Sequence, residues 1–131
     1  MNEDTPERAL KEAEGWLVSS KDKLILAQEE EVLANVVCAQ AIHAIIRAND
    51  ALTLKFFKVK ATRHDDITGL FIKMIKGKHI AEIDTIFKET LAIVVRDKSG
   101  ADYGKKQFSI KEAEKYIDKA EEFVNMVMKY I

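Results

Sequence analysis

A basic segment is the part of the sequence best suited to bind a charged ligand. Residues 55–78 contain seven lysines and arginines against two aspartates, a net charge of +5, whereas residues 1–31 have a net charge of −5. In the basic segment, cationic residues alternate with aromatic and aliphatic ones: Lys55, Lys58, Lys60 and Arg63 with Phe56, Phe57 and Val59. Cationic side chains mixed with aromatic rings attract a nucleic-acid backbone. The pattern predicts binding of nucleic acid or nucleotide, and the alternatives are an acidic partner surface or plain solvation.

The three histidines and the single cysteine do not form a metal-binding pattern. No histidine has the Glu-x-x-His spacing of di-iron bundles or the spacings of helical zinc sites. One cysteine cannot build a structural zinc site, and Cys38 lies on an apolar helix face, where it acts as a small core residue. We therefore expect no metal and no cofactor. His43 is expected to be a partly buried core residue, and His79 to begin a helix.

The hydrophobic pattern predicts a long central helix at residues 31–57. Apolar and mostly small residues recur there at steps of four and three, namely Ala34, Cys38, Ala41, Ile45, Ala48 and Leu52. Small residues let helix axes approach closely. Thr5 and Pro6 mark the start of a helix that precedes the central one. The central helix is therefore expected to pack along its length against several partners.

Three more helices are expected in the second half of the chain. A short helix should run from Asp65 to Gly77, and a fourth from about Ile80 to Lys98. A loop is expected at residues 103–108, followed by a capping box at Ser109 that begins the last helix. The prediction is an all-α chain, with residues 1–131 forming one domain. Its architecture is expected to be an antiparallel up-and-down bundle of four long helices plus one short helix.

The bulk composition bounds the class of protein. The chain of 131 residues has five glycines and one proline, which favours long helices over a many-stranded sheet. Its net charge of −1 argues by itself for neither nucleic-acid nor membrane binding. The charged N-terminus lacks the apolar region of a signal peptide, and no uninterrupted run of eighteen apolar residues occurs. We expect a cytoplasmic protein without a membrane span, which a lone cysteine also suits.

Two stretches of the sequence resemble HEPN domains, a family of small helical bundles. The stretch AQAIHAIIRANDALTLKFFKVKATRH looks like the central helix and following turn of the family. The stretch VVRDKSGADYGKKQFSIKEAEKYIDKAEEFV is similar to its C-terminal half. The resemblance extends from about Ala9 to Val127 and implies an antiparallel bundle of four or five helices, usually a homodimer. It also implies RNA binding or cleavage, or partnership with minimal nucleotidyltransferases in toxin–antitoxin systems.

The catalytic motif of the family is degenerate in this chain. RNA-cleaving HEPN domains carry Arg, four to six residues and then His, often as Arg-x-x-x-x-His-x-Tyr. Arg96 and Tyr103 match that frame, but Ala101 stands where the histidine belongs. Arginine can stabilise the phosphorane charge, but alanine cannot transfer a proton, and Asp102 as a base would repel the phosphate. We expect that Arg96 and Tyr103 bind a ligand, or that Arg96 pairs with Asp102 or caps a helix end while Tyr103 packs beneath.

The sequence thus predicts a non-catalytic, homodimeric RNA- or nucleotide-binding module of HEPN type. The ligand-binding candidates are Arg96, Tyr103, His64, Arg63, Lys60 and Lys58. One alternative is a partner subunit of a nucleotidyltransferase in a toxin–antitoxin type of complex. Another is a weak metal-independent RNase with His64 or Asp102 as the base, although His64 could instead bond the backbone at a helix start. Several predicted helices have apolar faces that are too wide for one neighbouring helix to cover. This suggests dimer contacts at Tyr116, Phe123, Met126 and Tyr130.

Overall fold

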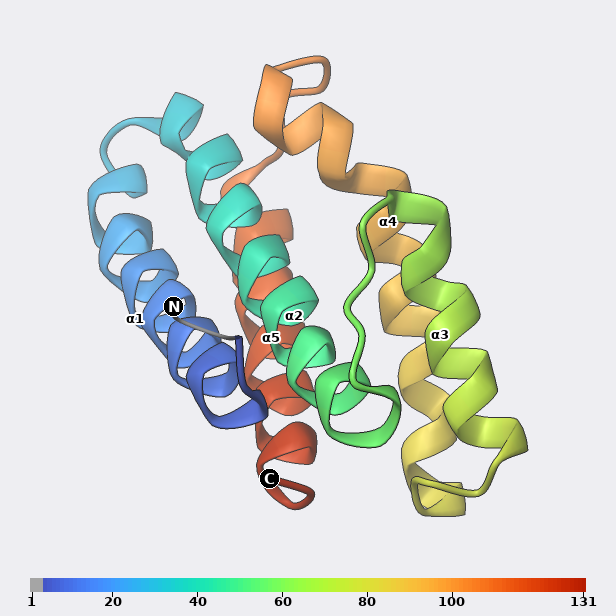
Figure 1. Ribbon diagram of the computed structural model, residues 1–131. Coiled ribbons are helices and arrows are strands. Elements are labelled where there is room, and N and C mark those ends of the chain that lie inside the picture. Colours follow the sequence, from blue (N-terminus) through green and yellow to red (C-terminus); the bar gives the residue numbers. More distant parts are fainter. Residues whose placement is uncertain (1–3) are drawn as a thin grey trace.

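The chain folds into helices joined by short connections. The computed structural model describes residues 4–131, apart from the side chains of His64 and Asp65. These residues are 80% helical and contain no strand, which confirms the all-α prediction. The helices are α1 (Pro6–Ala27), α2 (Ala34–Phe57), α3 (His64–Lys76), α4 (Phe87–Tyr103) and α5 (Ile110–Met128). In Figure 1, α2 lies between α1 and the pair formed by α3 and α4.

Helix α1 begins as the sequence predicts and packs closely on α2. The Thr5 side chain caps it by accepting a hydrogen bond from the Arg8 N–H at 3.1 Å. Ala9 and Ala13 are fully buried, and such small residues let the axes of two helices approach. At that close contact the buried Ser20 hydroxyl donates to the Val37 carbonyl at 2.9 Å. No polar atom of Ser20 is therefore left without a partner in the interface.

Helix α2 forms the centre of the fold. It contacts each of the other four α-helices, and a short 3₁₀ turn at Glu31–Leu33 precedes it. The predicted central helix at residues 31–57 is thereby confirmed, with its first turn in the tighter geometry. Cys38 is fully buried on this helix, and burial raises the pKa of its thiol to about 12. It fills space in the core as a small apolar residue does.

The stretch Glu31–Phe57 is long and apolar enough to cross a membrane, judged by length and composition alone. Buried core helices of soluble proteins meet the same criterion, and half of the most apolar window is buried inside this fold. The helix therefore behaves here as the core element around which the others pack. Its apolar character follows from contact with several neighbours rather than from one amphipathic stripe.

Helix α3 lies where the sequence predicts it and is followed by Gly77, but the boundaries of α4 differ from the predicted ones. Helix α4 begins at Phe87 after a 3₁₀ turn at Glu82–Ile86, and it continues past the predicted end at Lys98 to Tyr103. The Ser99–Gly100 pair does not end the helix, and the last segment of α4 turns away from the rest of the helix in Figure 1. Gly104, with a φ of 66°, ends the helix, because glycine adopts this left-handed conformation without strain.

The connection before α4 also corrects a prediction. His79 does not begin a helix: it lies in the connection after α3, and its ring stacks on Phe56 with centroids 5.1 Å apart. The His79 ring also meets Phe57 edge-on at 5.2 Å. These contacts close the end of the core at the last turn of α2.

Helix α5 begins with the predicted capping box. The Ser109 hydroxyl accepts from the Glu112 N–H at 3.0 Å, and the Ser109 N–H donates to the Glu112 carboxylate at 3.1 Å. The loop before it is fixed to α2 through Asn35, whose amide donates to the Lys106 carbonyl at 2.6 Å. The Asn35 side-chain oxygen also accepts from the Phe108 N–H at 2.8 Å. This loop therefore keeps a defined path over the end of α2.

Candidate nucleic-acid interface

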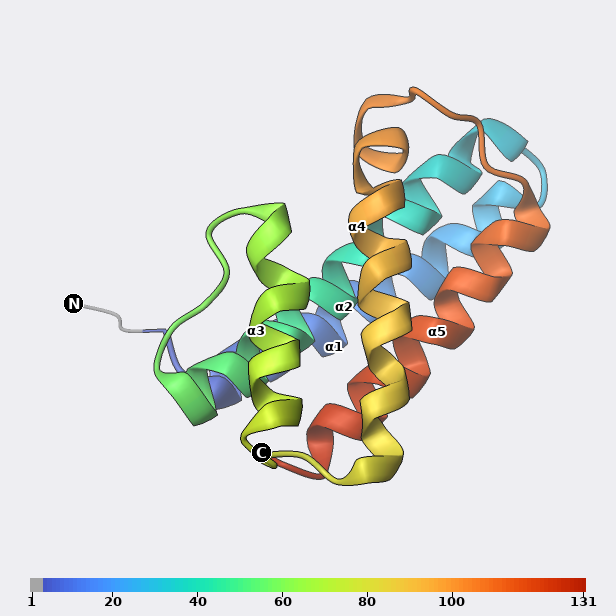
Figure 2. The ribbon, with the colours of Figure 1, turned by 90° about the vertical axis from the view of Figure 1, so that its right-hand side faces the viewer.

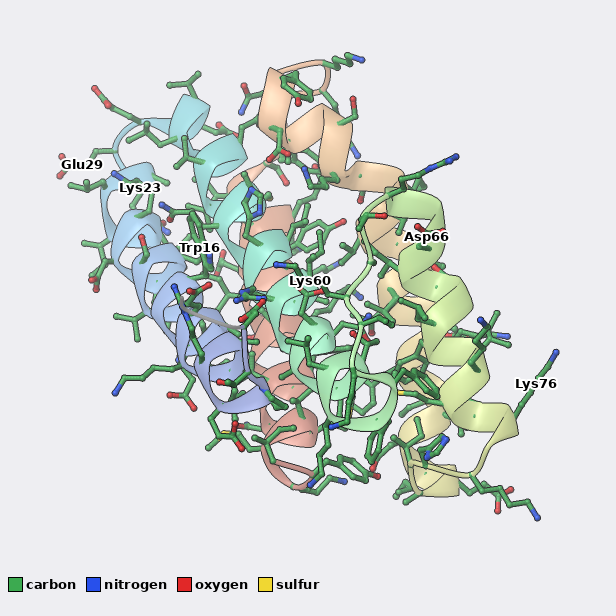
Figure 3. All side chains as sticks on the ribbon, in the orientation of Figure 1. Trp16, Lys23, Glu29, Lys60, Asp66 and Lys76 are labelled. Atoms are coloured by element: carbon green, nitrogen blue, oxygen red, sulfur yellow. The ribbon has the colours of Figure 1, made fainter. Side chains whose placement is uncertain are left out.

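The predicted basic residues lie on the connection between α2 and α3. This connection, residues 58–63, is called the basic loop below. Lys58 ends α2 with a φ of 57°, and its N–H donates to the Leu54 carbonyl at 3.1 Å. The reversed chain then passes in front of α2 to the start of α3, and Lys60 lies over α2 (Figure 3). Arg63 precedes α3 in an extended conformation and is exposed.

A shallow groove separates the basic loop from α3. Its volume is about 360 Å³, within the size range of small-ligand sites. This loop groove is lined by Val59, Lys60, Ala61, Asp66, Gly69, Leu70 and Lys73. Two lysines and one aspartate therefore border a floor formed by Val59, Ala61, Gly69 and Leu70. Such a floor suits a base or sugar, while the lysines suit a phosphate.

Much of the positive charge here has no carboxylate partner. Among the described side chains, Lys58, Lys73, Lys76 and Lys78 form no ion pair, whereas Lys60 pairs with Asp4 at 3.2 Å. Figure 3 shows Lys76 extending away from α3 into solvent. Apart from Lys60, which pairs with Asp4 of the acidic first third, these lysines keep the excess positive charge of the basic segment at this surface. The side chain of His64, another predicted ligand, lies outside the described part of the structure.

Arg96 lies at a different place from the basic loop. It borders a hollow between α4 and α5, together with Ile93, Asp97, Glu112, Lys115, Tyr116 and Lys119. This α4–α5 hollow shares no residue with the loop groove. Figure 2 shows the basic loop and α5 on opposite sides of α4. The predicted ligand-binding residues therefore divide between two surfaces and do not form one site.

The Arg96 guanidinium is bound to its own neighbour. Its Nε and Nη2 atoms lie 3.0 and 3.1 Å from the two carboxylate oxygens of Asp97. Asp97 is buried and also accepts a hydrogen bond from the Tyr116 hydroxyl. Burial alone would raise the pKa of Asp97, but the hydrogen bonds from Arg96 and Tyr116 outweigh it and lower that pKa. The predicted alternative, a pair between Arg96 and Asp102, is wrong.

The other residues of the degenerate frame point in different directions. Ala101 is buried, with 6% of its surface exposed, whereas Tyr103 is 74% exposed and does not pack beneath Arg96. Asp102 contacts Lys98 at 2.5 Å instead. These residues share one bent helix, but its turns distribute them over several faces. The position that would hold a catalytic histidine faces the core.

Sequence reasoning did not identify a cluster around His43. The His43 Nε2 atom lies 3.5 Å from an Asp102 carboxylate oxygen, and its ring stacks on Trp16 with centroids 5.0 Å apart. Burial lowers the pKa of His43 and outweighs the opposing effect of Asp102, so the imidazole is neutral at pH 7. The predicted partial burial of His43 is confirmed. Its partner Asp102 lies on α4, far from His43 in the sequence, so the spacing of residues could not predict this contact.

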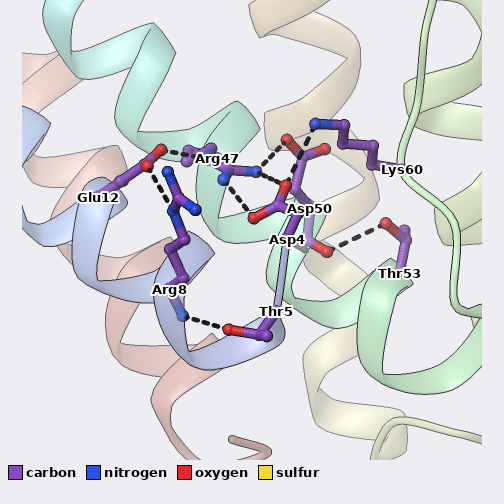
Figure 4. A network of polar contacts seen from close by, with 8 residues as sticks. All are labelled: Asp4, Thr5, Arg8, Glu12, Arg47, Asp50, Thr53 and Lys60. Carbon is purple, nitrogen blue, oxygen red and sulfur yellow. Dashed lines mark hydrogen bonds and ion pairs between the residues drawn. The ribbon is translucent and has the colours of Figure 1, made fainter. Parts of the chain in front are cut away.

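A second cluster missed from the sequence surrounds Arg47 on α2. Its guanidinium binds carboxylates of Asp4 at 2.7 Å, Glu12 at 2.7 Å and Asp50 at 3.1 Å (Figure 4). Lys60 of the basic loop joins it through Asp4. The only local signal is the three-residue spacing of Arg47 and Asp50, which places both on one helix face. The other partners are distant in sequence.

The proposed dimer contacts on α5 were mostly wrong. Tyr116, Phe123 and Met126 are buried within the single chain, since their faces pack into the core. Tyr130 is partly buried, and its hydroxyl binds the Asp84 carboxylate at 2.5 Å. The wide apolar face of α5 is therefore covered by the rest of the chain.

The comparisons with known proteins add no relative to this description. No protein-family model matches the chain. No curated protein matches it either. Among the described residues, no three histidine, cysteine, aspartate or glutamate side chains gather as a metal site requires.

Proposed function

We propose that the protein is a non-catalytic module that binds RNA or nucleotide through the basic loop and the loop groove. The observation that carries this proposal is that Lys58, Lys73, Lys76 and Lys78, which lie in the basic loop, on α3 and just after it, form no ion pair with any described side chain. Unneutralised cations attract phosphate groups and release counterions on binding. We further propose an antiparallel HEPN-like bundle that acts as a cytoplasmic homodimer. The sequence resemblance and the five-helix content support this part.

The backbone at Lys58 supports the same assignment. A φ of 57° costs a non-glycine residue about 1 kcal/mol, so glycine would be the easier residue to place there. The chain instead carries a lysine at the point where the basic loop leaves α2. A positive charge at a locally unfavourable position is consistent with a role in binding.

The test is a mixed RNA pool incubated with purified protein, followed for both mobility shift and cleavage. We expect a shift without cleavage. The variant Lys58→Gln/Lys60→Gln/Arg63→Gln should weaken binding at every salt concentration. It should also reduce the slope of the logarithm of the binding constant against the logarithm of the salt concentration by about two to three. The control Lys11→Gln/Lys88→Gln/Lys111→Gln removes the same charge from exposed positions on α1, α4 and α5. Equal loss in both variants would refute the assigned surface, and cleavage would refute the non-catalytic role.

Arg96→Ala separates the two surfaces in the same assay. Because Arg96 lies away from the basic loop, its removal should leave the shift unchanged within about twofold. A strong loss of binding would move the interface to the α4–α5 hollow. Cleavage that disappears in this variant would instead support the weak RNase.

A protein-partner role is the second candidate. Four large apolar side chains are exposed on the outer part of α1 and the turn after it, namely Val18, Ile25, Leu26 and Val32. Exposed apolar groups on one side of a domain are typical of protein contacts. The partner in this proposal is a minimal nucleotidyltransferase. Co-purification with such an enzyme, lost in Ile25→Asp, would support it, and an absence of RNA binding would favour it over the first proposal.

A further inference from the structure

The carboxylate of Asp4 is held between two cations from other parts of the chain. Arg47 approaches it with two parallel hydrogen bonds, Nη2 to Oδ1 at 2.7 Å and Nη1 to Oδ2 at 2.9 Å. The Lys60 ammonium lies 3.2 Å from Oδ2 (Figure 4). A guanidinium fork with an added ammonium is an arrangement that recognises carboxylates and phosphates. The hydrogen bond from Arg47, supported by Lys60, lowers the pKa of Asp4 to about 2.

The Arg47 guanidinium keeps its position through contacts that do not involve Asp4. Glu12 on α1 accepts from Arg47 Nε at 2.7 Å, and Asp50 on α2 accepts from Nη1 at 3.1 Å. These contacts fix the guanidinium plane, of which only a small part is exposed. Asp4, by contrast, precedes the cap residue of α1 and lies outside the helix. Of the charged groups in this cluster, the Asp4 carboxylate is thus the one held least firmly by the helices.

Space is available beside the Asp4 carboxylate. A small hollow there is lined by Asp4, Thr5, Pro6, Leu54 and Lys58. Lys60 lies on the other side and also borders the loop groove. The basic loop therefore connects the anion-binding atoms to the surface assigned above. A ligand whose phosphate reached Arg47 would extend toward residues already proposed to bind RNA.

We propose that Arg47 and Lys60 form a phosphate site that Asp4 occupies within the chain, and that a phosphate of the bound RNA or nucleotide displaces Asp4. This inference rests on the proposed function. It adds a named contact, Arg47, that charge patterning did not reveal, and it assigns the N-terminal segment the role of a competitor for the same site.

Charge balance and shared contacts favour exchange over simple addition. With Asp4 in place, the carboxylates of Asp4, Glu12 and Asp50 face the cations of Arg47, Lys60 and Arg8, which lies 3.5 Å from Glu12, so the cluster is neutral. Asp4 also occupies the Arg47 and Lys60 nitrogens that a phosphate would need. Without Asp4 the cluster carries a net charge of +1, and an entering phosphate supplies the negative charge that Asp4 provided. Phosphate and Asp4 are therefore alternatives at one site.

The exchange model and a purely structural clamp predict opposite effects for Asp4→Asn. Loss of a clamp would loosen the site and weaken phosphate binding or leave it unchanged. Loss of a tethered competitor strengthens binding, because the phosphate no longer competes with a carboxylate held at high effective concentration. Asp22→Asn is the matched control. It removes the same charge from an exposed position of α1 that forms no ion pair with any described side chain.

The experiment titrates inorganic phosphate at pH 7 and follows the Arg47 Nε–Hε resonance by NMR. We expect the dissociation constant to fall about tenfold in Asp4→Asn and by less than twofold in Asp22→Asn. Adding Lys60→Gln to Asp4→Asn should remove most of the gain while leaving the helical scaffold intact. Lys60→Gln alone, with Asp4 retained, should weaken phosphate binding below that of the unaltered protein, which tests the site without the Asp4 substitution.

The outcomes separate this inference from the proposed function. Unchanged or weaker phosphate binding in Asp4→Asn, measured on folded protein, would overturn the exchange model even if RNA shifts in the mobility assay. Stronger phosphate binding at Arg47 with no RNA shift would support the anion site and refute the RNA-binding module. Equal gains in Asp4→Asn and Asp22→Asn would show a general charge effect and would also overturn the inference.

Discussion

Arg47 and Arg96 each bind an aspartate with two parallel hydrogen bonds, but they occupy very different environments. Arg47 joins carboxylates from the segment before α1, from α1 and from its own helix, and its side chain is only 16% exposed. Arg96 binds the residue next to it, and its side chain is 68% exposed. Arg96 matches a sequence motif, but it is exposed and binds only its neighbour. Arg47 lies where several elements meet and is therefore the better candidate for a binding site.

The sharpest test of this comparison is Arg47→Met. Methionine keeps much of the apolar stem but leaves Asp4, Glu12 and Asp50 without their shared cation. Breaking a mostly buried ion pair on one side is strongly destabilising, so we expect a loss of about 3 kcal/mol in the free energy of unfolding. Urea unfolding followed by circular dichroism at pH 7 measures it. Arg96→Met should cost clearly less, and the reverse order would break the comparison.

Ala101→His tests whether the degenerate frame could be repaired. Because Ala101 is buried, the imidazole would have to enter a packed region at the bend of α4. Overpacking of this kind costs about 2 kcal/mol, and we expect no RNA cleavage. Thermal unfolding and the RNA assay give the two readings. Tyr103→His introduces the same side chain at an exposed position and should leave stability unchanged; a cleaving Ala101→His protein would contradict the geometry described.

Tyr116→Phe removes the second contact of Asp97. The buried hydroxyl donates to that carboxylate, so its loss should lower the free energy of unfolding by about 1.5 kcal/mol at pH 7. Burial and the hydrogen bond to Asp97 raise the pKa of Tyr116 above its usual 10. Its contribution is therefore complete below pH 10 and is lost as the pH rises further. The Phe variant should show a flatter stability profile above pH 10, and parallel profiles would contradict this assignment.

The smallest expected effect concerns the backbone at Lys58. Lys58→Gly relieves the left-handed strain and should raise the free energy of unfolding by up to about 1 kcal/mol, while RNA binding weakens. Lys78 has a φ of 55° and follows α3, outside the basic loop, so Lys78→Gly provides a matched control. Both variants should be stabilised, but only Lys58→Gly should show the larger loss in the mobility shift assay. Equal losses would remove the special role of the basic loop.

The sequence predicted those parts of the fold that depend on local signals. The cap at Thr5, the capping box at Ser109 and the small-residue pattern of α2 each act within one or two turns, and each was found where expected. The end of α4 was misplaced because Ser99 and Gly100, two residues of low helix propensity, remain helical in the structure.

The candidate site was less predictable because its partners are remote in the sequence. Charge counting identified the basic segment, and the structure leaves its lysines largely without carboxylate partners in the described region. Nothing local indicated that Arg47 would meet residues 43 positions away at Asp4 and 35 away at Glu12. The same holds for His43 and Asp102, which come from different helices. Only the packing of α1 and α4 onto α2 creates these pairs.

The burial of Cys38 gives the protein an intrinsic probe of its own opening. It is the only cysteine of the chain, and its thiol is fully buried on α2 with a pKa of about 12. A thiol that is both inaccessible and protonated does not react with alkylating reagents at neutral pH. Labelling can then proceed only when the helices around α2 separate, so the rate of alkylation measures how often the core opens. A ligand that closes the domain would slow that rate without any engineered reporter.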